Sequence, residues 1–213
     1  MRTKSETRRQ AILQAAAEVF RETGFERSSM SDIRERVGYS KPTLYSYFES
    51  KEALFSAVVF EATELEFQAT LQALDPDQSD ITLALQSFGQ RLLALLYSPQ
   101  VQAVRRMVVS QARPSALGRT CYEMGPVRSE AAIAAFLQQA MDRGQLRQTN
   151  ARIAALQLKG LLEAEWIEPF LFNALEEPSP PQIRETVTRA VSVFMAAYRP
   201  LASDGGPGEA APV

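Results

Sequence analysis

Apolar residues recur through most of this chain at the spacing of one helix face. Over residues 6–22, Ile12, Ala16, Val19 and Phe20 follow each other at steps of four, three and one. Residues spaced in this way lie on a single face of a helix and are buried together. No stretch alternates apolar and polar residues long enough to predict a strand. The pattern therefore predicts an all-α protein.

Capping residues and helix breakers divide this pattern into separate helices. Ser29 and Asp32 have the spacing of a capping box, and Ser40 precedes Pro42, which suits the first turn of a helix. Pro169 is expected to kink the ninth helix. We expect about nine to ten helices, over residues 6–22, 30–37, 41–48, 51–74, 81–97, 99–112, 115–124, 127–143, 150–175 and 182–199.

The overall composition is that of a globular protein. Of the 213 residues, 46% are hydrophobic and 23% are charged, close to the globular average. Charged residues or glutamine interrupt every apolar run before it reaches the ~18–20 residues of a membrane span. The N-terminus leads directly into an amphipathic helix, without the apolar segment of a secretory signal. We therefore expect a cytoplasmic protein with no membrane partner.

The residue types that are missing limit the chemistry. The chain has no histidine and one cysteine, Cys121, which excludes histidine-based catalysis, an internal disulfide and a thiolate zinc site. Glu163 and Glu165 stand two residues apart in a predicted helix, where side chains diverge, and Asp75 and Asp77 flank a proline in a turn. Neither pair suits general acid–base chemistry. We expect no enzyme activity, no cofactor and no metal.

Charge is unevenly distributed along the chain. Residues 1–51 carry 10 Lys or Arg against 7 Asp or Glu, whereas the rest of the chain carries 13 against 18. A basic N-terminal segment on an acidic body favours a polyanionic partner for that segment, although chance on helix faces gives similar imbalances.

The segment Met30–Phe48 has the pattern of a helix-turn-helix. Gly38 permits a tight turn between two short helices, and the second helix then projects for insertion into the major groove of DNA. Polar groups for DNA on this second helix come from Lys41, Thr43, Tyr45 and Tyr47. The residues spaced to hold it on the first helix are Ile33, Val37, Leu44 and Phe48.

This segment carries a family resemblance. The run Gly38–Leu54, with Ser29–Ile33 before it, closely resembles the N-terminal DNA-binding domain of the TetR family of bacterial transcriptional regulators. The match covers residues 6–60 without a gap. The segments Gly125–Arg128 and Gly144–Arg147 look like the ligand-binding half of the same family.

The resemblance implies which residues face DNA. Tyr45 and Lys51 would bind phosphates, whereas Lys41 and Thr43, with Tyr47, would face bases or their sugar-phosphate edges. Arg2 and Lys4 would add an arm that reaches the backbone or the minor groove. The full set of positions that match DNA-facing positions of the family is Ser31, Lys41, Pro42, Thr43, Tyr45, Tyr47 and Lys51.

Several of these positions have a second interpretation. Arg34 stands where the family usually has a small residue, and is either a further phosphate contact or an outward-facing charge. Tyr39 replaces a small aliphatic residue in the turn. Tyr45 also suits the core of the helix-turn-helix unit. Lys41 and Lys51 also suit solvated positions at helix starts, although a lysine there opposes the helix dipole.

The rest of the chain is predicted to provide dimerisation and ligand binding. We expect a DNA-binding domain over residues 1–52, a ligand-binding and dimerisation domain over 53–200, and a Gly/Pro/Ala-rich, disordered tail over 201–213. The resemblance implies a homodimer joined by the last two long helices of each subunit. Candidate interface residues, about half of them expected to be intrachain core instead, are Leu156, Ala164, Ile167, Leu171, Val187, Val191, Phe194 and Tyr198.

The resemblance also implies an effector pocket between the middle helices. Its unknown small-molecule effector would be amphipathic or apolar, since such pockets are mostly apolar with a few polar anchors. The candidate ligand-binding residues are Phe88, Met107, Tyr122, Phe136, Trp166 and Phe170, and the candidate anchors are Arg105, Gln111, Gln157 and Glu163. The family function would be repression at a palindromic double-stranded DNA operator, relieved by the effector. The alternative is a TetR-like carrier of an apolar ligand that does not bind DNA.

Overall fold

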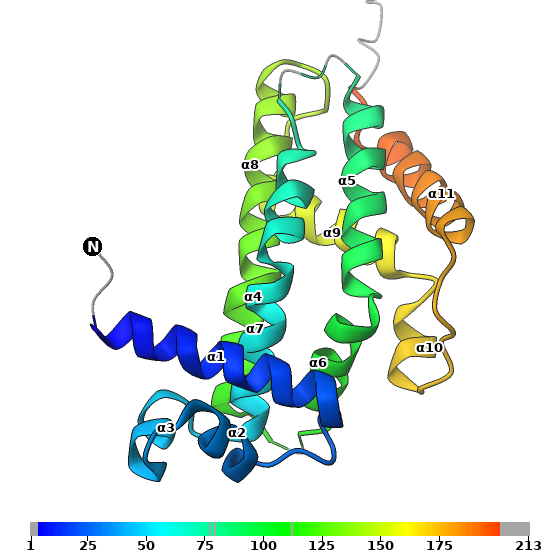
Figure 1. Cartoon of the computed structure of the whole chain (residues 1–213). Coiled ribbons are helices and arrows are strands. Elements are labelled where there is room, and N and C mark those ends of the chain that lie inside the picture. The colour runs from blue at the N-terminus through cyan, green and yellow to red at the C-terminus, as the bar shows by residue number, and fades with distance from the viewer. Residues whose placement is uncertain (1–3, 77, 79, 112, 201–213) are drawn as a thin grey trace, which may run out of the picture.

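The computed structural model describes residues 4–76, 78, 80–111 and 113–200, and every regular element in these ranges is helical (Figure 1). The all-α prediction is confirmed for this part of the chain. The predicted disordered tail and Arg2 lie outside the described residues. The elements are α1 (Lys4–Thr23), α2 (Met30–Val37), α3 (Lys41–Tyr47), α4 (Lys51–Gln72), α5 (Ile81–Leu96), α6 (Pro99–Val109), α7 (Ala116–Tyr122), the π-helical turn η1 (Glu123–Val127), α8 (Arg128–Asp142), α9 (Ala151–Glu163), α10 (Ile167–Leu171) and α11 (Pro180–Tyr198).

Two clusters of buried apolar side chains organise these helices. The smaller cluster joins α1 to α4 and is built around Ile12, Ile33, Leu44 and Leu54. The larger cluster joins α5, α8, α9 and α11 and is built around Phe88, Leu137, Leu158 and Phe194. α4 contributes Leu54 to the first, and Leu74, just beyond its end, belongs to the second. Figure 1 shows α4 running from the α2–α3 end of the molecule alongside α8. A change in the tilt of α4 would therefore displace side chains in both clusters.

The largest departures from the predicted helices are found at two places. The expected helix 150–175 stops at Glu163, and Pro169 lies in the first turn of α10, where its missing N–H costs no hydrogen bond. The break lies instead at 164–166, where Trp166 turns inward and packs edge-on against Tyr97 at 5.0 Å between ring centroids. The expected break at Gly125–Pro126 is replaced by η1, which leads directly from α7 into α8.

α5 lies unusually close to α9 and α11 at one point, Gly89. A Cβ atom at Gly89 would lie 2.9 Å from Leu162 Cδ2 and 2.9 Å from Val187 Cγ1. Real Cβ atoms do not approach other atoms so closely, so the side chains of α9 and α11 occupy the space that any larger residue would need. The larger core thus depends on glycine at this position.

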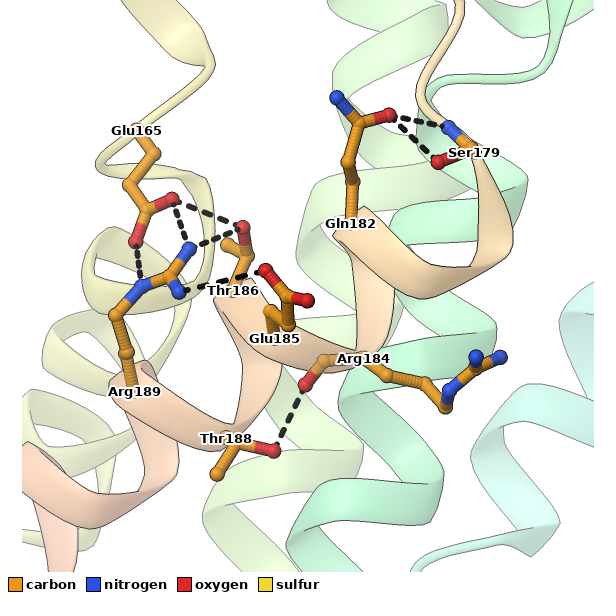
Figure 2. Close-up of polar contacts among 8 residues, drawn as sticks. All are labelled: Glu165, Ser179, Gln182, Arg184, Glu185, Thr186, Thr188 and Arg189. Atoms are coloured by element: carbon orange, nitrogen blue, oxygen red, sulfur yellow. Dashed lines mark hydrogen bonds and ion pairs between the residues drawn. The ribbon is translucent and has the colours of Figure 1, made fainter.

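Polar contacts fix both the start of α11 and its angle to the α9–α10 turn (Figure 2). At the start, the backbone N–H and the hydroxyl of Ser179 donate to Gln182 Oε1 at 2.8 and 2.7 Å. Further along, Arg189 donates to both carboxylate oxygens of Glu165 at 2.8 and 2.7 Å, and Thr186 donates to one of them at 2.9 Å. A bidentate pair of this kind gives directional as well as electrostatic attachment.

Half of the candidate interface residues prove to be intrachain core, as expected. Val187, Val191, Phe194 and Tyr198 are buried within the larger cluster. Leu156, Ala164 and Leu171 are exposed, and Ile167 is half-buried. The outer surfaces of α9 and α11 also expose Ile153 and Val193. These two helices therefore retain apolar surface that the single chain does not cover.

Candidate nucleic-acid interface

Local sequence signals build the α2–α3 unit as predicted. Ser29 and Asp32 form the capping box of α2, with N···O distances of 2.8 and 3.2 Å. Gly38 ends α2 with φ = 74°, a left-handed conformation that residues with a Cβ adopt only with strain. Ser40 caps α3 by accepting from the Thr43 N–H at 3.3 Å. The turn between α2 and α3 is therefore fixed by its own residues.

The predicted DNA-facing side chains of this unit lie mainly on its outer surface. Ser31, Lys41, Pro42 and Tyr45 are exposed, and Thr43 is half-buried. The exposed fraction of Tyr45 is 42%, so its interpretation as a core aromatic is wrong, whereas Phe48 is buried as expected. α2 and α3 lie at one end of the molecule (Figure 1). This end presents hydroxyl groups and a lysine together.

The ammonium group of Lys41 is free of ion pairs with the described residues and can bind an anion. Its Nζ lies 5.8 Å from the centroid of the Tyr45 ring, and no carboxylate of the described residues forms an ion pair with it. A lysine without a carboxylate partner at the start of a helix retains its full attraction for an anion. Tyr47 differs from these residues because it is half-buried and packs against the smaller cluster.

Lys51 is used inside the fold. Its Nζ donates to the carbonyl oxygens of Phe25 at 2.8 Å and Ser28 at 3.0 Å, and it lies 4.2 Å from the Phe25 ring centroid. The interpretation of Lys51 as a solvated charge is therefore wrong. Its ammonium group holds the loop between α1 and α2, and a phosphate contact by the same group stays a prediction.

Arg36 forms a contact between α2 and α1 that was not predicted from the sequence. Its guanidinium donates to Glu18 at 3.2 Å and to both oxygens of Glu22 at 3.1 and 2.6 Å, which ties α2 to α1. These hydrogen bonds lower the pKa of Glu22 and raise that of Arg36. The spacing of Glu18 and Glu22, one turn apart on one helix face, was the available signal. Arg34 lies 3.4 Å from Glu35 and contacts no other element through an ion pair in the described chain.

The six predicted ligand-binding residues differ in burial, and ligand binding by them stays a prediction. Phe88, Phe136, Trp166 and Phe170 are buried in the larger cluster, whereas Met107 is half-buried on α6 and Tyr122 is exposed on α7.

Two predicted anchors, Arg105 and Glu163, form an ion pair with each other. Arg105 Nη2 lies 2.6 Å from Glu163 Oε1, and the hydroxyl of Tyr97 donates to the same oxygen at 3.0 Å. Burial, and secondarily the negative charge of Glu163, raise the pKa of Tyr97. The Arg105 guanidinium also lies 4.5 Å from the Phe170 ring centroid. This cluster of paired groups consolidates α5, α6, α9 and α10.

A groove of about 650 Å³ is found elsewhere, between α1, α4, α7, η1 and the start of α8. Its α8 wall is held by Arg128, which donates to both carboxylate oxygens of Glu64 at 3.0 and 2.6 Å. The Arg128 guanidinium lowers the pKa of Glu64 from 4.5 to about 2. Glu64 is therefore charged, and its ion pair with Arg128 attaches α4 to α8, at any pH well above this pKa.

We expect the contribution of this pair to vanish in acid. A carboxyl whose pKa is lowered on folding stabilises the folded state above its unfolded pKa, and the effect is lost as pH falls from 4.5 towards 2. Arg128→Gln should lower the free energy of unfolding at pH 7 by less than about 1 kcal/mol, because both side chains are partly exposed. Urea unfolding at pH 7, 4.5 and 3 should show the difference from wild type shrinking with acid. A constant difference, or an equal effect of the unpaired control Arg119→Gln, would contradict the assignment.

Among the described residues there is neither a cluster suited to a metal ion nor a helix suited to a membrane. No group of three or more His, Cys, Asp or Glu side chains in this part of the chain is arranged to hold a metal ion. Within the same residues, no helix has the length and apolar character needed to cross a membrane.

Family comparisons match both parts of the chain. A family described as "Bacterial regulatory proteins, tetR family" matches residues 12–58, which include α2 and α3. A second, described as "AefR-like transcriptional repressor, C-terminal domain", matches residues 83–200, more than half of the chain.

Individual proteins agree with these matches. The regulator UidR of Escherichia coli K12 is 33% identical over 117 residues, which span 49% of this chain and 60% of UidR. A TetR-family regulator from Mesorhizobium loti has a TM-score of 0.77 and 28% identity, and the alignment covers 93% of this chain and 100% of that one. The flavonoid-responsive regulator FrrA has a TM-score of 0.66 and 26% identity, with 92% and 99% coverage.

Proposed function

Because this chain belongs to the TetR family of helix-turn-helix transcriptional regulators, we propose that it represses transcription as a homodimer bound to a palindromic operator. The observation that carries the proposal is the outer surface of the α2–α3 unit. Lys41 and Tyr45 are exposed there on α3, beside the turn fixed by Gly38, and Lys41 has no carboxylate partner in the described chain. A helix with such groups at its start can enter a major groove and contact phosphates and base edges.

Repression, rather than activation, is supported by the C-terminal half. The family matched over residues 83–200 is described as a transcriptional repressor domain. FasR of Mycolicibacterium smegmatis, a transcriptional activator, is 38% identical to this chain, but only over 73 residues that span 34% of the chain. The longer match therefore favours repression.

Dimerisation is supported by uncovered apolar surface on α9 and α11. Leu156 and Val193 are exposed, the latter with an exposed fraction of 55%, and a Cβ atom at Gly160 would meet nothing within 4 Å. Contact between these helices in two subunits would bury this surface and place two α3 helices for half-sites about 34–36 Å apart.

Effector release is supported by the position of α4 between the two apolar clusters. A ligand that binds better to one tilt of α4 shifts the population towards that tilt, and reciprocally changes operator affinity. Release therefore requires only that the DNA-bound and ligand-bound states differ in α4.

The test is selection of genomic DNA fragments by the purified full chain, followed by binding measurements at several salt concentrations. We expect a palindromic fragment that binds two chains, with the logarithm of affinity falling steeply against the logarithm of salt concentration. Weak binding without sequence preference would reject operator binding and favour a ligand carrier.

The dimer is tested in the same assay by Val193→Arg, with Arg184→Ala as a control of an exposed α11 residue. A charge at the centre of an apolar contact should dissociate the dimer in sedimentation and weaken operator binding at least about tenfold, because each half-site then binds alone. A Val193→Arg protein that remains dimeric would place the interface elsewhere.

A further inference from the structure

The groove between α1, α4 and α7 has the size and walls of a small-molecule site. Its volume of about 650 Å³ lies within the range of ligand pockets. One continuous face of α4 forms its base, where Ala53, Ala57 and Phe60 follow at helical spacing. Leu117 of α7 and Met124 of η1 face them across the groove. These apolar walls join the DNA-binding end of the molecule to its body.

A buried hydroxyl in the wall lacks a strong partner. Ser56 is 3% exposed and lines the groove, and its Oγ has no nitrogen or oxygen partner among the described residues. The polar group beside it is the thiol of Cys121, which hydrogen-bonds only weakly. Buried polar groups in folded proteins normally have strong partners, so Ser56 is an incompletely satisfied polar group in the wall of the groove.

The charges of the groove favour a cation. Of its three carboxylates, Glu64 is neutralised by Arg128. Glu61 receives only an amide N–H from Gln10 at 3.4 Å, and Glu49 has no ion pair with a described residue. The second arginine of the groove, Arg9, is 3.9 Å from Glu6, outside the groove lining. Glu49 and Glu61 thus form no ion pair with a described residue, and the lining as a whole carries three carboxylates against two guanidinium groups.

The separation of these carboxylates decides the kind of cation. Glu61 lies ten residues after Lys51, the first residue of α4, which is a rise of about 15 Å along the helix, and Glu49 lies before that start. No single metal ion can contact both. We propose that the groove binds an amphipathic organic cation, with its apolar part against Phe60 and Leu117 and its charge near Glu61 or Glu49. A molecule bound there contacts both α1 and α7. Release of the operator by such a molecule rests on the function proposed above.

The binding test uses two ions of the same shape and opposite charge, tetraphenylphosphonium and tetraphenylborate. Calorimetric titration into the DNA-free full chain should show tetraphenylphosphonium binding at least about tenfold more tightly than the anion. Glu61→Gln, combined with Glu49→Gln, should remove most of that preference by loss of charge attraction. Glu66→Gln, an exposed carboxylate of α4 outside the groove, should leave it unchanged.

Two results would overturn the proposal. One is equal affinity for both ions, and the other is a preference that the double Gln variant does not change. As a second variant, Ala57→Trp fills the groove from α4 and should abolish binding of tetraphenylphosphonium, while circular dichroism checks that the fold persists. Because these titrations contain no DNA, failure to find an operator does not affect them. Conversely, cation binding without a change in operator affinity would retain the site and reject only its coupling to DNA.

Discussion

Replacing both Lys41 and Tyr45 by alanine is expected to weaken operator binding about a thousandfold. Each side chain is exposed on α3, and a dimer loses four such contacts at once. At about 1 kcal/mol for each contact, the total is about 4 kcal/mol, which corresponds to nearly three powers of ten in affinity. If Lys41 binds phosphate, the slope of log affinity against log salt should also fall by about 2 for the dimer.

The measurement is a fluorescence-anisotropy titration of the selected operator with each protein at three salt concentrations. The control variant, Arg119→Ala with Tyr122→Ala, removes the same kinds of side chain from exposed positions on α7. Both variants should unfold close to the wild-type temperature, because none of the four side chains belongs to either apolar cluster. An affinity within threefold of wild type for the Lys41/Tyr45 variant would show that α3 does not read the operator.

Lys51 is a poor choice for this experiment despite its position in the family pattern. Its ammonium group donates to the carbonyl oxygens of Phe25 and Ser28, so alanine at Lys51 would loosen the α1–α2 loop as well as remove a charge. A loss of DNA binding by that variant would have two explanations. Lys41 and Tyr45 avoid the ambiguity because they support no other element through a described hydrogen bond.

Local signals in the sequence were sufficient to locate the helix-turn-helix. The capping box of Ser29 and Asp32, the left-handed Gly38 and the capping Ser40 act within a few residues, so their geometry follows from residue type and spacing. The limits of α2 were accordingly predicted to the residue, and α3 to within one residue.

Contacts between distant residues could not be predicted in the same way. Trp166 ends the ninth helix early because Tyr97, about seventy residues before it, offers a ring to pack against. Phe88 and Phe136 were expected to line a pocket but fill the core, since an apolar residue at helical spacing suits both roles. The groove beside α4 needs three helices placed together, and its α4 residues alone resemble an ordinary mixed helix face.

Gly89→Leu is expected to lower the free energy of unfolding by about 2–3 kcal/mol. Even a Cβ atom at this position would lie 2.9 Å from Leu162 and Val187, and leucine adds three further carbons into the same space. Overpacking typically costs about 1–3 kcal/mol and occasionally more, and for four carbons in filled space we expect about 3–4 kcal/mol, less a gain of about 0.8 kcal/mol in helix propensity. For a chain of this length, the melting temperature should fall by about 4–12 °C.

Ser87→Leu is the matched control, since Ser87 is exposed on the same helix two residues away. It should change the free energy of unfolding by no more than about 0.5 kcal/mol. Both variants should be melted at the same protein concentration as wild type, because a dimer makes the melting temperature depend on concentration. Equal stability of the two leucine variants would mean that α5 can move away from α9 and α11 at little cost. In that case Gly89 would not be what holds the helices of the larger core at their observed spacing. The core against which α4 moves when a ligand binds would then be less tightly packed than these distances indicate.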